Sequence, residues 1–256
     1  MMDEAVARIE AALEGDERIL VYGDFDADGI TSTVLLLSAL RRKTDEGNVE
    51  FFIPNRIEDG YGPNQTIFEE IVVGQYDLVI TVDNGVSGAR EIGFLTSRGV
   101  DVIVVDHHAF VEEVPEVTIL HPDHPDGEYP FKSLAGVGIT YKLVQALGLD
   151  RKEDLGWVAI GTVADLVPMI DENKKLVAEG LKVLNDTPPA GVHTLLRSAG
   201  SDGYIDEETI AFGLAPRLNA TGRLGEAEID HPPYCASDAD DPQKLQEIYA
   251  LITTRM

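Results

Sequence analysis

Aspartate and histidine side chains gather in three short clusters in the first half of the chain, each directly after an apolar run. The clusters are Asp24-Phe25-Asp26-Ala27-Asp28-Gly29, Asp83-Asn84-Gly85 and Asp106-His107-His108. Carboxylates that lie close together cannot all stay ionised without compensating positive charge, and few basic residues lie near these clusters. Divalent cations would supply that charge. An oxygen-rich ligand set with one or two histidines suits Mn²⁺ or Mg²⁺ better than Zn²⁺.

The apolar runs before the clusters are typical of buried β-strands. They are continuous and β-branched rather than alternating, which predicts strands covered on both faces of a parallel sheet. We expect strands over 19–25, 49–54, 77–83 and 101–106, with helices over 30–43, 64–74 and 86–99. Ligands bind beyond the carboxyl ends of such strands, so the three clusters should meet at one edge. A single aspartate there is usually a helix cap, but three clusters together indicate a site.

The chain becomes mostly helical from about residue 134. We expect helices over 134–148, 154–168, 174–185 and about 192–199, then a turn-rich stretch to 241 and a last helix over 243–255. The helix 154–168 is apolar and carries Asp165 near its end. A buried carboxylate needs a partner, which is either a hydrogen-bond donor or a metal ion. The neighbouring clusters favour the metal.

The composition excludes several classes of protein. Of 256 residues, 44% are hydrophobic and one is cysteine, so the chain can bury a core but has no disulfide framework and no cysteine zinc site. The apolar runs are shorter than the ~18 residues of a membrane span, which predicts a cytoplasmic protein. With 46 acidic against 20 basic residues, the net charge is −26. Such a chain cannot bind nucleic acid through a broad basic face, and any polyanion must be held locally by metals or a few arginines.

The three clusters, together with Gly161-Thr162-Val163-Ala164-Asp165, resemble the four motifs of the DHH phosphoesterase superfamily, in the same order. The segments 53–62, 129–138 and 215–224 are similar to those of its RecJ branch of single-strand-specific exonucleases. The resemblance runs from about residue 19 to 225. It implies an α/β fold in which a parallel sheet flanked by helices, the DHH domain, is followed by a mostly helical C-terminal part. We expect this catalytic domain over 1–241, with its α/β core ending near 130. The segment 242–256 would be a connector helix toward a second substrate-binding domain that this chain lacks.

The resemblance also implies roles for individual residues. Two Mn²⁺ ions, with Mg²⁺ as an alternative, would be held by Asp24, Asp26, Asp28, Asp83, His107 and Asp165. Asp83 would bridge the ions and act in catalysis. Asp28, His107 and Asp165 would complete one site, and Asp26 with Asp24 the other. His108 would face the phosphate, and Asp106 would orient a histidine. Because His107 and His108 are adjacent at a strand end, their rings should point apart. Tyr22 stands where the pyrophosphatase relatives have a histidine.

The expected substrate contacts lie in the RecJ-like segments and at the start of one helix. They are Arg56, Tyr61, Gly136, Gly138, Arg217, Asn219 and Arg223. The Gly-Xaa-Gly at 136–138 opens a helix, whose free N–H groups can bind phosphate; close helix packing is the alternative reading. Tyr61, between two glycines, could stack on a base or pack against the protein. His121, His124, His193 and His231 match no constellation and are interpreted as structural.

The function implied is metal-dependent phosphodiester hydrolysis by a two-metal mechanism. The substrate would be single-stranded nucleic acid, DNA rather than RNA, degraded by an exonuclease of repair and recombination, with replication or repair proteins as partners and no membrane. Two alternatives remain open. One is a phosphoesterase acting on short oligonucleotides or dinucleotides. The other is a catalytically weak, replication-associated binding protein.

Overall fold

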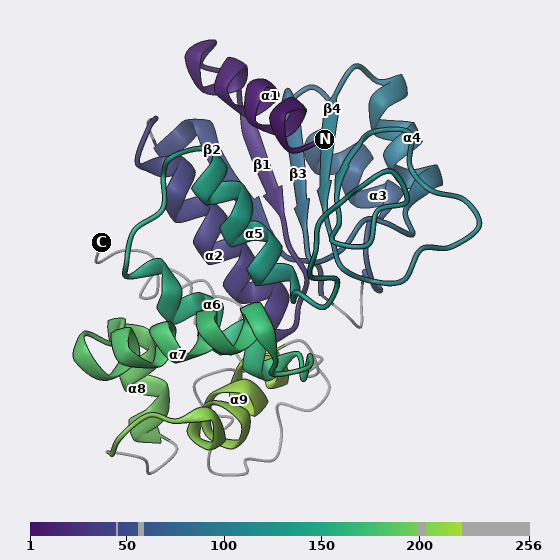
Figure 1. The fold of residues 1–256 in the computed structure, drawn as a ribbon. Helices are drawn as coiled ribbons and strands as arrows, with labels where there is room; N and C mark the ends of the chain where they lie inside the picture. The colour runs from purple at the N-terminus through teal and green to yellow at the C-terminus, as the bar shows by residue number, and fades with distance from the viewer. Residues whose placement is uncertain (45, 56–58, 199–202, 222–256) are drawn as a thin grey trace.

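Five parallel strands form the centre of the molecule (Figure 1). The computed structural model describes all residues except 45, 56–58, 199–202 and 222–256. In spatial order the strands are β2 (Val49–Phe52), β1 (Ile19–Tyr22), β3 (Leu78–Val82), β4 (Asp101–Val105) and β5 (Thr118–Leu120). All four pairings are parallel, which confirms the predicted sheet. The edge strand β5 was not predicted, because three residues are too few to show a periodicity.

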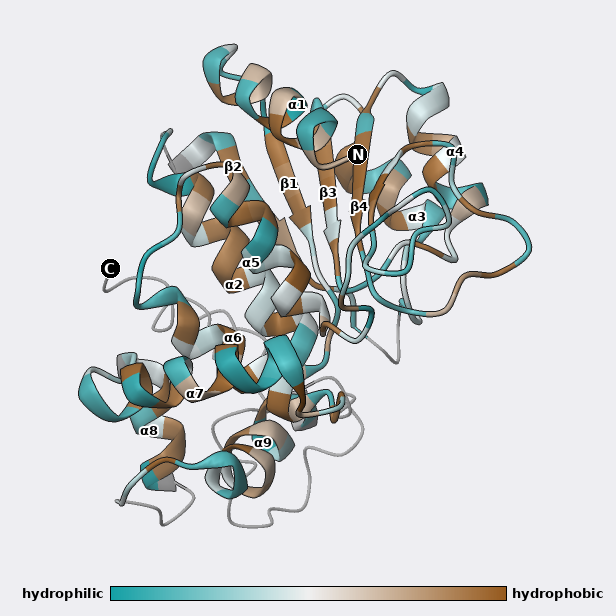
Figure 2. Cartoon of the chain, viewed as in Figure 1, coloured by the Kyte–Doolittle hydropathy of each residue, from teal (hydrophilic) through white to brown (hydrophobic). Residues whose placement is uncertain are grey.

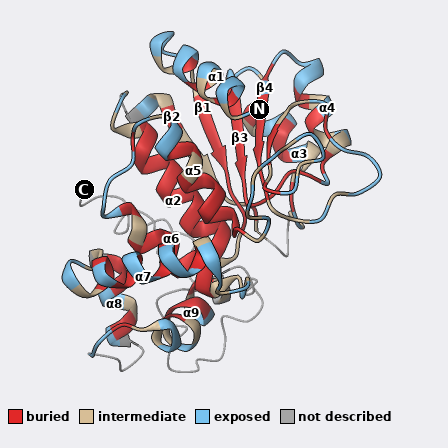
Figure 3. Cartoon of the chain, viewed as in Figure 1, coloured by how far each residue is buried: buried red, intermediate tan, exposed pale blue. Residues whose placement is uncertain are grey.

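Alternate residues of each strand point to opposite faces of the sheet, and helices cover both. Ile19 and Val21 pack into a core with α1 (Met2–Glu14), α2 (Ala27–Arg41) and α5 (Gly136–Ala146). Leu20 and Tyr22 pack into a second core with α3 (Gln65–Ile67), the π-helical segment Phe68–Val72 and α4 (Ala89–Ser97). The inner strands β1, β3 and β4 are buried along almost their whole length (Figure 3), as their continuous apolar sequence requires, whereas the edge strand β2 is mostly half-buried.

A helical part continues from the sheet at the end to which the strand arrows point (Figure 1). It contains α6 (Asp154–Ala164), α7 (Asp171–Asp186), α8 (Ala190–Ser198), the π-helical segment Thr209–Leu214 and α9 (Ala215–Thr221). Its apolar side chains pack on the first half of α2, through Ala27, Ile30 and Val34. Figure 2 shows hydrophobic positions facing inward between these helices.

The helical segments over 209–221 correct the expectation of a turn-rich stretch there. Gly213 and Pro216 weaken the helical signal of the sequence, but Ile210, Leu214 and Leu218 are buried against the other helices, and this packing outweighs local propensity. The predicted helix 243–255, the boundary at 241 and the connector 242–256 lie outside the described residues.

The helix α2 begins three residues earlier than expected, and its start explains the spacing of the first cluster. The Asp26 side chain caps it by accepting hydrogen bonds from the N–H groups of Asp28 and Gly29, both at 3.0 Å. Nearly every residue of α2 is buried, so Asp28, in its first turn, lies inside the molecule. Among the described helices, none is long and apolar enough to cross a membrane.

Candidate metal centre

The structure brings all six predicted metal ligands together beyond the carboxyl ends of β1, β3 and β4. They form two groups in which one ligand atom of each residue lies within 4.8 Å of the others: Asp28, His107 and Asp165, and Asp24, Asp26 and Asp83. The groups adjoin, because His107 Nε2 lies 3.1 Å from Asp83 Oδ1. A third combination of Asp83, His107 and His108 satisfies the same distance limit.

Three ligand atoms in this cluster are buried and form no well-directed hydrogen bond with the described residues. They are Asp24 Oδ1, Asp83 Oδ1 and His107 Nε2. The 3.1 Å contact of His107 Nε2 with Asp83 Oδ1 lacks hydrogen-bond geometry. Both aspartates are 1% exposed, and a buried polar atom without a partner costs about 1–3 kcal/mol. A cation bound among these atoms would remove that cost. The donor set, five carboxylates and an imidazole, is the kind that Mn²⁺ and Mg²⁺ accept.

Burial also sets the protonation of these carboxylates. It raises the pKa of Asp24 from 3.8 to about 7, with the charge of Asp26 as the next cause. It raises the pKa of Asp165 to about 6, again assisted by Asp26. The pKa values of Asp28 and Asp83 rise well above their usual range for the same reason. Carboxyl groups crowded in this way take up either protons or cations.

Three glycines allow the backbone to approach the carboxylates. A Cβ atom at Gly29 would lie 2.5 Å from Asp24 Cβ, and one at Gly136 would lie 2.5 Å from Asp83 Oδ1. A Cβ at Gly161 would lie 2.8 Å from Asp28 Oδ1. No real Cβ tolerates such distances, so only glycine fits. Sequence reasoning assigned no role to Gly29 and Gly161; their position within the quoted motifs is the signal that identifies them.

The start of α5 binds a carboxylate of the cluster. Gly136 N–H donates to Asp28 Oδ2 at 2.7 Å, and Val137 N–H donates to Asp28 Oδ1 at 2.9 Å. The amides predicted to hold substrate phosphate are therefore engaged by Asp28 in this structure. A Cβ at Gly138 would lie 3.2 Å from Leu134 Cδ2, four residues earlier in the same segment, so this local contact does not test the alternative reading of close packing between helices.

Asp83 is held in a strained conformation. Its φ of 61° lies in the left-handed region, which aspartate and asparagine tolerate better than other non-glycine residues. Its N–H donates to the carbonyl of Val105 at 2.8 Å. The next residue, Asn84, donates from its side chain to the carbonyls of Val82 and Tyr22 at 2.9 and 3.3 Å. Strain of this kind is found where function requires it, and here it turns the carboxylate of Asp83 toward both ligand groups.

Asp106 organises the tandem histidines. Its Oδ1 accepts from the N–H groups of His107 and His108 at 2.7 and 3.1 Å and lies 2.8 Å from His108 Nδ1. Its Oδ2 accepts from Val86 N–H at 2.9 Å. The hydrogen bond to Asp106 raises the pKa of His108, whereas burial, followed by the charge of His108, lowers the pKa of His107 to about 4. Sequence reasoning missed Val86, because a backbone donor leaves no signature in the sequence.

The expectation that the two histidine rings point apart is wrong. Their centroids are 4.6 Å apart, at an interplanar angle of 55°. The reason is that both backbone amides turn toward Asp106, so the chain no longer alternates as in a strand. Their nitrogen atoms nevertheless have different neighbours: His107 Nε2 lies 3.6 Å from Asp165 Oδ2 and 3.8 Å from Asp28 Oδ2, while His108 is bound to Asp106.

The predicted substrate residues fall into three groups. The Tyr61 hydroxyl lies 3.1 Å from His108 Nε2, its side chain is 52% exposed, and Tyr22 anchors its loop by donating to the carbonyl of Gly62 at 3.1 Å. Asn219 and Arg217 bond to the protein: Asn219 Oδ1 accepts from Ala27 N–H at 2.8 Å, and Arg217 donates to the carbonyl of Gly213 at 2.7 Å. Arg56 and Arg223 lie outside the described residues.

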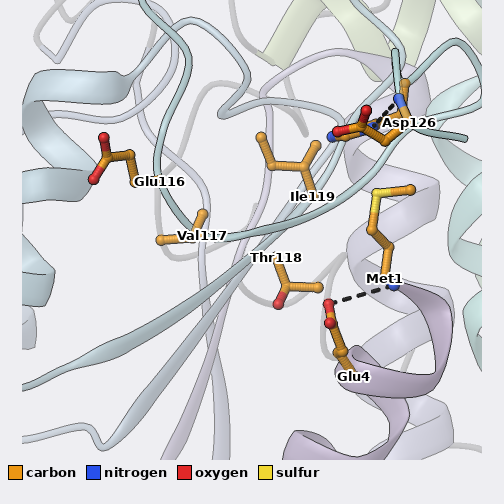
Figure 4. A pocket seen from close by; sticks show the side chains of 8 residues that line it. Met1, Glu4, Glu116, Val117, Thr118, Ile119 and Asp126 are labelled. Carbon is orange, nitrogen blue, oxygen red and sulfur yellow. Dashed lines mark hydrogen bonds and ion pairs between the residues drawn. The ribbon is translucent and has the colours of Figure 1, made fainter.

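A hollow of about 670 Å³ lies elsewhere, between the start of α1 and the edge strand β5 (Figure 4). Glu4, Glu116 and Asp126 are among its lining residues. The N-terminal amino group of Met1 pairs with Glu4 at 3.3 Å there. None of its lining residues belongs to the two ligand groups, so this hollow is separate from the candidate metal centre.

Comparison with known proteins agrees with the geometry. Residues 18–168 match the model of the DHH family, N-terminal domain. The chain is 45% identical over 230 residues to the single-stranded-DNA-specific exonuclease RecJ of Bacillus subtilis (strain 168), covering 89% of this chain and 29% of that protein. The curated relatives are longer, and the chain spans less than half of their length.

Solved structures show the same likeness. A crystal structure of exonuclease RecJ bound to manganese has a TM-score of 0.79 and 35% identity, covering 99% of this chain and 64% of that one. RecJ from Thermus thermophilus in complex with Mg²⁺ has a TM-score of 0.63 and 31% identity, covering 99% and 34%. The motif order, the parallel sheet and the converging ligands thus have a common explanation: the chain belongs to the DHH family, and its relatives within that family are RecJ exonucleases.

Proposed function

We propose that this chain carries the catalytic centre of a RecJ-like exonuclease, which hydrolyses phosphodiester bonds in single-stranded nucleic acid and prefers DNA. One observation carries the proposal: two adjoining ligand groups meet at Asp83, and three of their buried atoms form no hydrogen bond with the described residues. The names of the relatives, which specify single-stranded DNA, support the substrate. The retention of every acidic motif and both histidines favours hydrolysis over binding alone.

We assign the ligands by their grouping. Asp28, His107 and Asp165 would hold one cation, and Asp24 and Asp26 the other, with Asp83 facing both. When bound, two divalent cations supply a hydroxide nucleophile and stabilise the attacking and leaving oxygens of an in-line displacement. The glycine contacts keep the carboxylates at fixed positions, so the site needs little rearrangement to receive its ions.

We assign proton handling to His108. Its Nδ1 is bound to Asp106, and its Nε2 lies beside the hydroxyl of the half-exposed Tyr61. Because Asp106 raises the pKa of His108, the ring is protonated more readily than a free histidine. It can then donate from Nε2 to a phosphate oxygen or to the leaving group, while Asp106 keeps the ring in place.

The remaining substrate contacts stay predictions. Tyr61 reaches the site, and Arg56, Arg217 and Arg223 are the candidate phosphate contacts of an otherwise acidic chain. With a net charge of −26, the protein would hold DNA mainly through its cations and a few local donors. We place it in the cytoplasm, with repair and recombination as its process. The rest of the substrate groove would come from a second domain, as the greater length of the relatives suggests.

The test compares Mn²⁺-dependent degradation of single-stranded DNA, single-stranded RNA and dinucleotides by the wild type and by Asp83→Asn. Asparagine tolerates the left-handed φ of Asp83 but removes the shared carboxylate. Asp101→Asn, at the opposite end of β4 and paired on the surface with Arg8, is the matched control. We expect the wild type and Asp101→Asn to degrade single-stranded DNA fastest, and Asp83→Asn to be folded and inactive.

Three results would argue against the proposal. Undiminished hydrolysis by Asp83→Asn would exclude a shared ligand. Dinucleotide cleavage without DNA cleavage would favour the small-substrate phosphoesterase. DNA binding by the wild type with no hydrolysis in Mn²⁺ or Mg²⁺ would favour the binding protein.

A further inference from the structure

His121, which follows the last residue of β5, contacts the tandem histidines from outside the metal cluster. Its Nε2 lies 2.8 Å from the carbonyl oxygen of His108, and its Nδ1 lies 3.0 Å from the backbone nitrogen of Asp123. A carbonyl can only accept a hydrogen bond and a backbone N–H can only donate one. The two contacts therefore place the proton on Nε2 and leave Nδ1 as the acceptor.

This contact completes a clamp on the segment Asp106–His108. Within the segment, the Asp106 carboxylate accepts hydrogen bonds from the amides of His107 and His108. Two further hydrogen bonds join the segment to β5 and to the residue after it: Asp106 N–H donates to the carbonyl of Leu120 at 3.1 Å, and His121 donates to the carbonyl of His108. One end of the segment is thus fixed to β5 and the other to the residue that follows β5.

The His121 ring is itself held in position. It packs against Phe110, with centroids 4.4 Å apart, and the ring of His124 contacts the same Phe110 edge-on at 5.9 Å. With both nitrogens bonded and one face packed, the ring has a single orientation. Such rigid support is what keeps a catalytic group at its working position.

We propose that His121 is a positioning residue: by donating from Nε2 to the carbonyl of His108, it fixes the backbone that presents the His108 ring to the substrate. The inference rests on the proposed function, in which His108 acts on the phosphate. His121 belongs to neither ligand group, so its effect should fall on turnover more than on metal affinity.

The test uses two variants of equal length and flexibility. His121→Gln keeps an N–H donor at about the same distance from the backbone as Nε2 of histidine. His121→Met has as many rotatable side-chain bonds as glutamine but no hydrogen-bond donor. We expect His121→Met to lower kcat for single-stranded DNA by roughly 10-fold, with KM and Mn²⁺ affinity changed far less, and His121→Gln to restore most of the loss. Equal losses in the two variants, or none in a folded His121→Met, would overturn the proposal.

A second measurement does not depend on activity. Long-range ¹H–¹⁵N spectra of the wild type at neutral pH should show His121 protonated at Nε2, and the His108 ring signals should shift in His121→Met but not in His121→Gln. A His121 proton on Nδ1 would contradict the contact itself. If the wild type hydrolyses no phosphodiester but these spectra appear as expected, the proposed function fails while the positioning contact stands.

Discussion

Replacing Asp24 with asparagine should raise the free energy of unfolding of the metal-free protein and weaken its binding of Mn²⁺. Asp24 is 1% exposed, and burial, followed by the charge of Asp26, raises its pKa to about 7. In the unfolded chain an aspartate titrates near 3.9. Between these values the folded state holds a proton that the unfolded state has lost, so the free energy of unfolding falls as the pH rises. Three pKa units correspond to about 4 kcal/mol. Asparagine, which resembles the protonated carboxyl group, lacks this penalty.

The assay is urea unfolding of both proteins in EDTA, followed by circular dichroism from pH 4 to 8. The advantage of Asp24→Asn should grow with pH and level off above about pH 7. Mn²⁺ should offset this advantage, because the wild type gains a ligand that the variant lacks; binding at 1,000 times Kd adds about 4.1 kcal/mol, which matches the penalty of about 4 kcal/mol. A difference between the two proteins that is flat across this range would refute the reasoning, since Asp24 would then be ionised in both states.

Three further outcomes are expected. Gly136→Ala should lower the free energy of unfolding by about 1–3 kcal/mol and weaken Mn²⁺ binding in calorimetry, because its Cβ would lie 2.5 Å from Asp83 Oδ1; unchanged affinity would contradict the close approach. His108→Ala should lower kcat by roughly 100-fold and change Mn²⁺ affinity little, and a loss of affinity as large as that of His107→Ala would make His108 a ligand. Finally, KCl should stabilise the folded state by screening the net charge of −26, and a melting temperature that does not rise with salt would show that this charge is already compensated.

The convergence of the candidate ligands could be predicted because each cluster follows a strand that is buried on both faces. The run Leu78–Val82 is apolar except for the buried Thr81 and carries no charge, so the first carboxylate after it, Asp83, is expected at the end of the strand. Parallel order then brings Asp83 to Asp24 and His107 without any knowledge of loops. Asp165 follows from similar reasoning, since the apolar stretch 155–164 ends at this acid and leaves it in need of a partner.

What escaped prediction depends on contacts between distant backbone groups. The amides of Gly136 and Val137 bind Asp28 across more than a hundred residues, and a glycine motif does not reveal which anion it holds. The turn of both histidine amides toward Asp106 depends on that carboxylate's orientation, which alternation along a strand does not describe. The helices over 209–221 form because their apolar residues meet α2 and α6, whereas their local sequence is ambiguous.

The hydrogen bond from Ala27 N–H to Asn219 has a consequence for the order in which the protein matures. It joins the first motif to a residue 192 positions later. Synthesis proceeds from the N-terminus, so the sheet and all six candidate ligands leave the ribosome before Asn219 does. The hydrogen bond that fixes the start of α2, which bears Asp28, therefore cannot form in a nascent chain until α9 has emerged. We expect ribosome-stalled chains that end before residue 215 to bind Mn²⁺ more weakly than chains from which α9 has emerged, so that the candidate metal centre is completed late in translation.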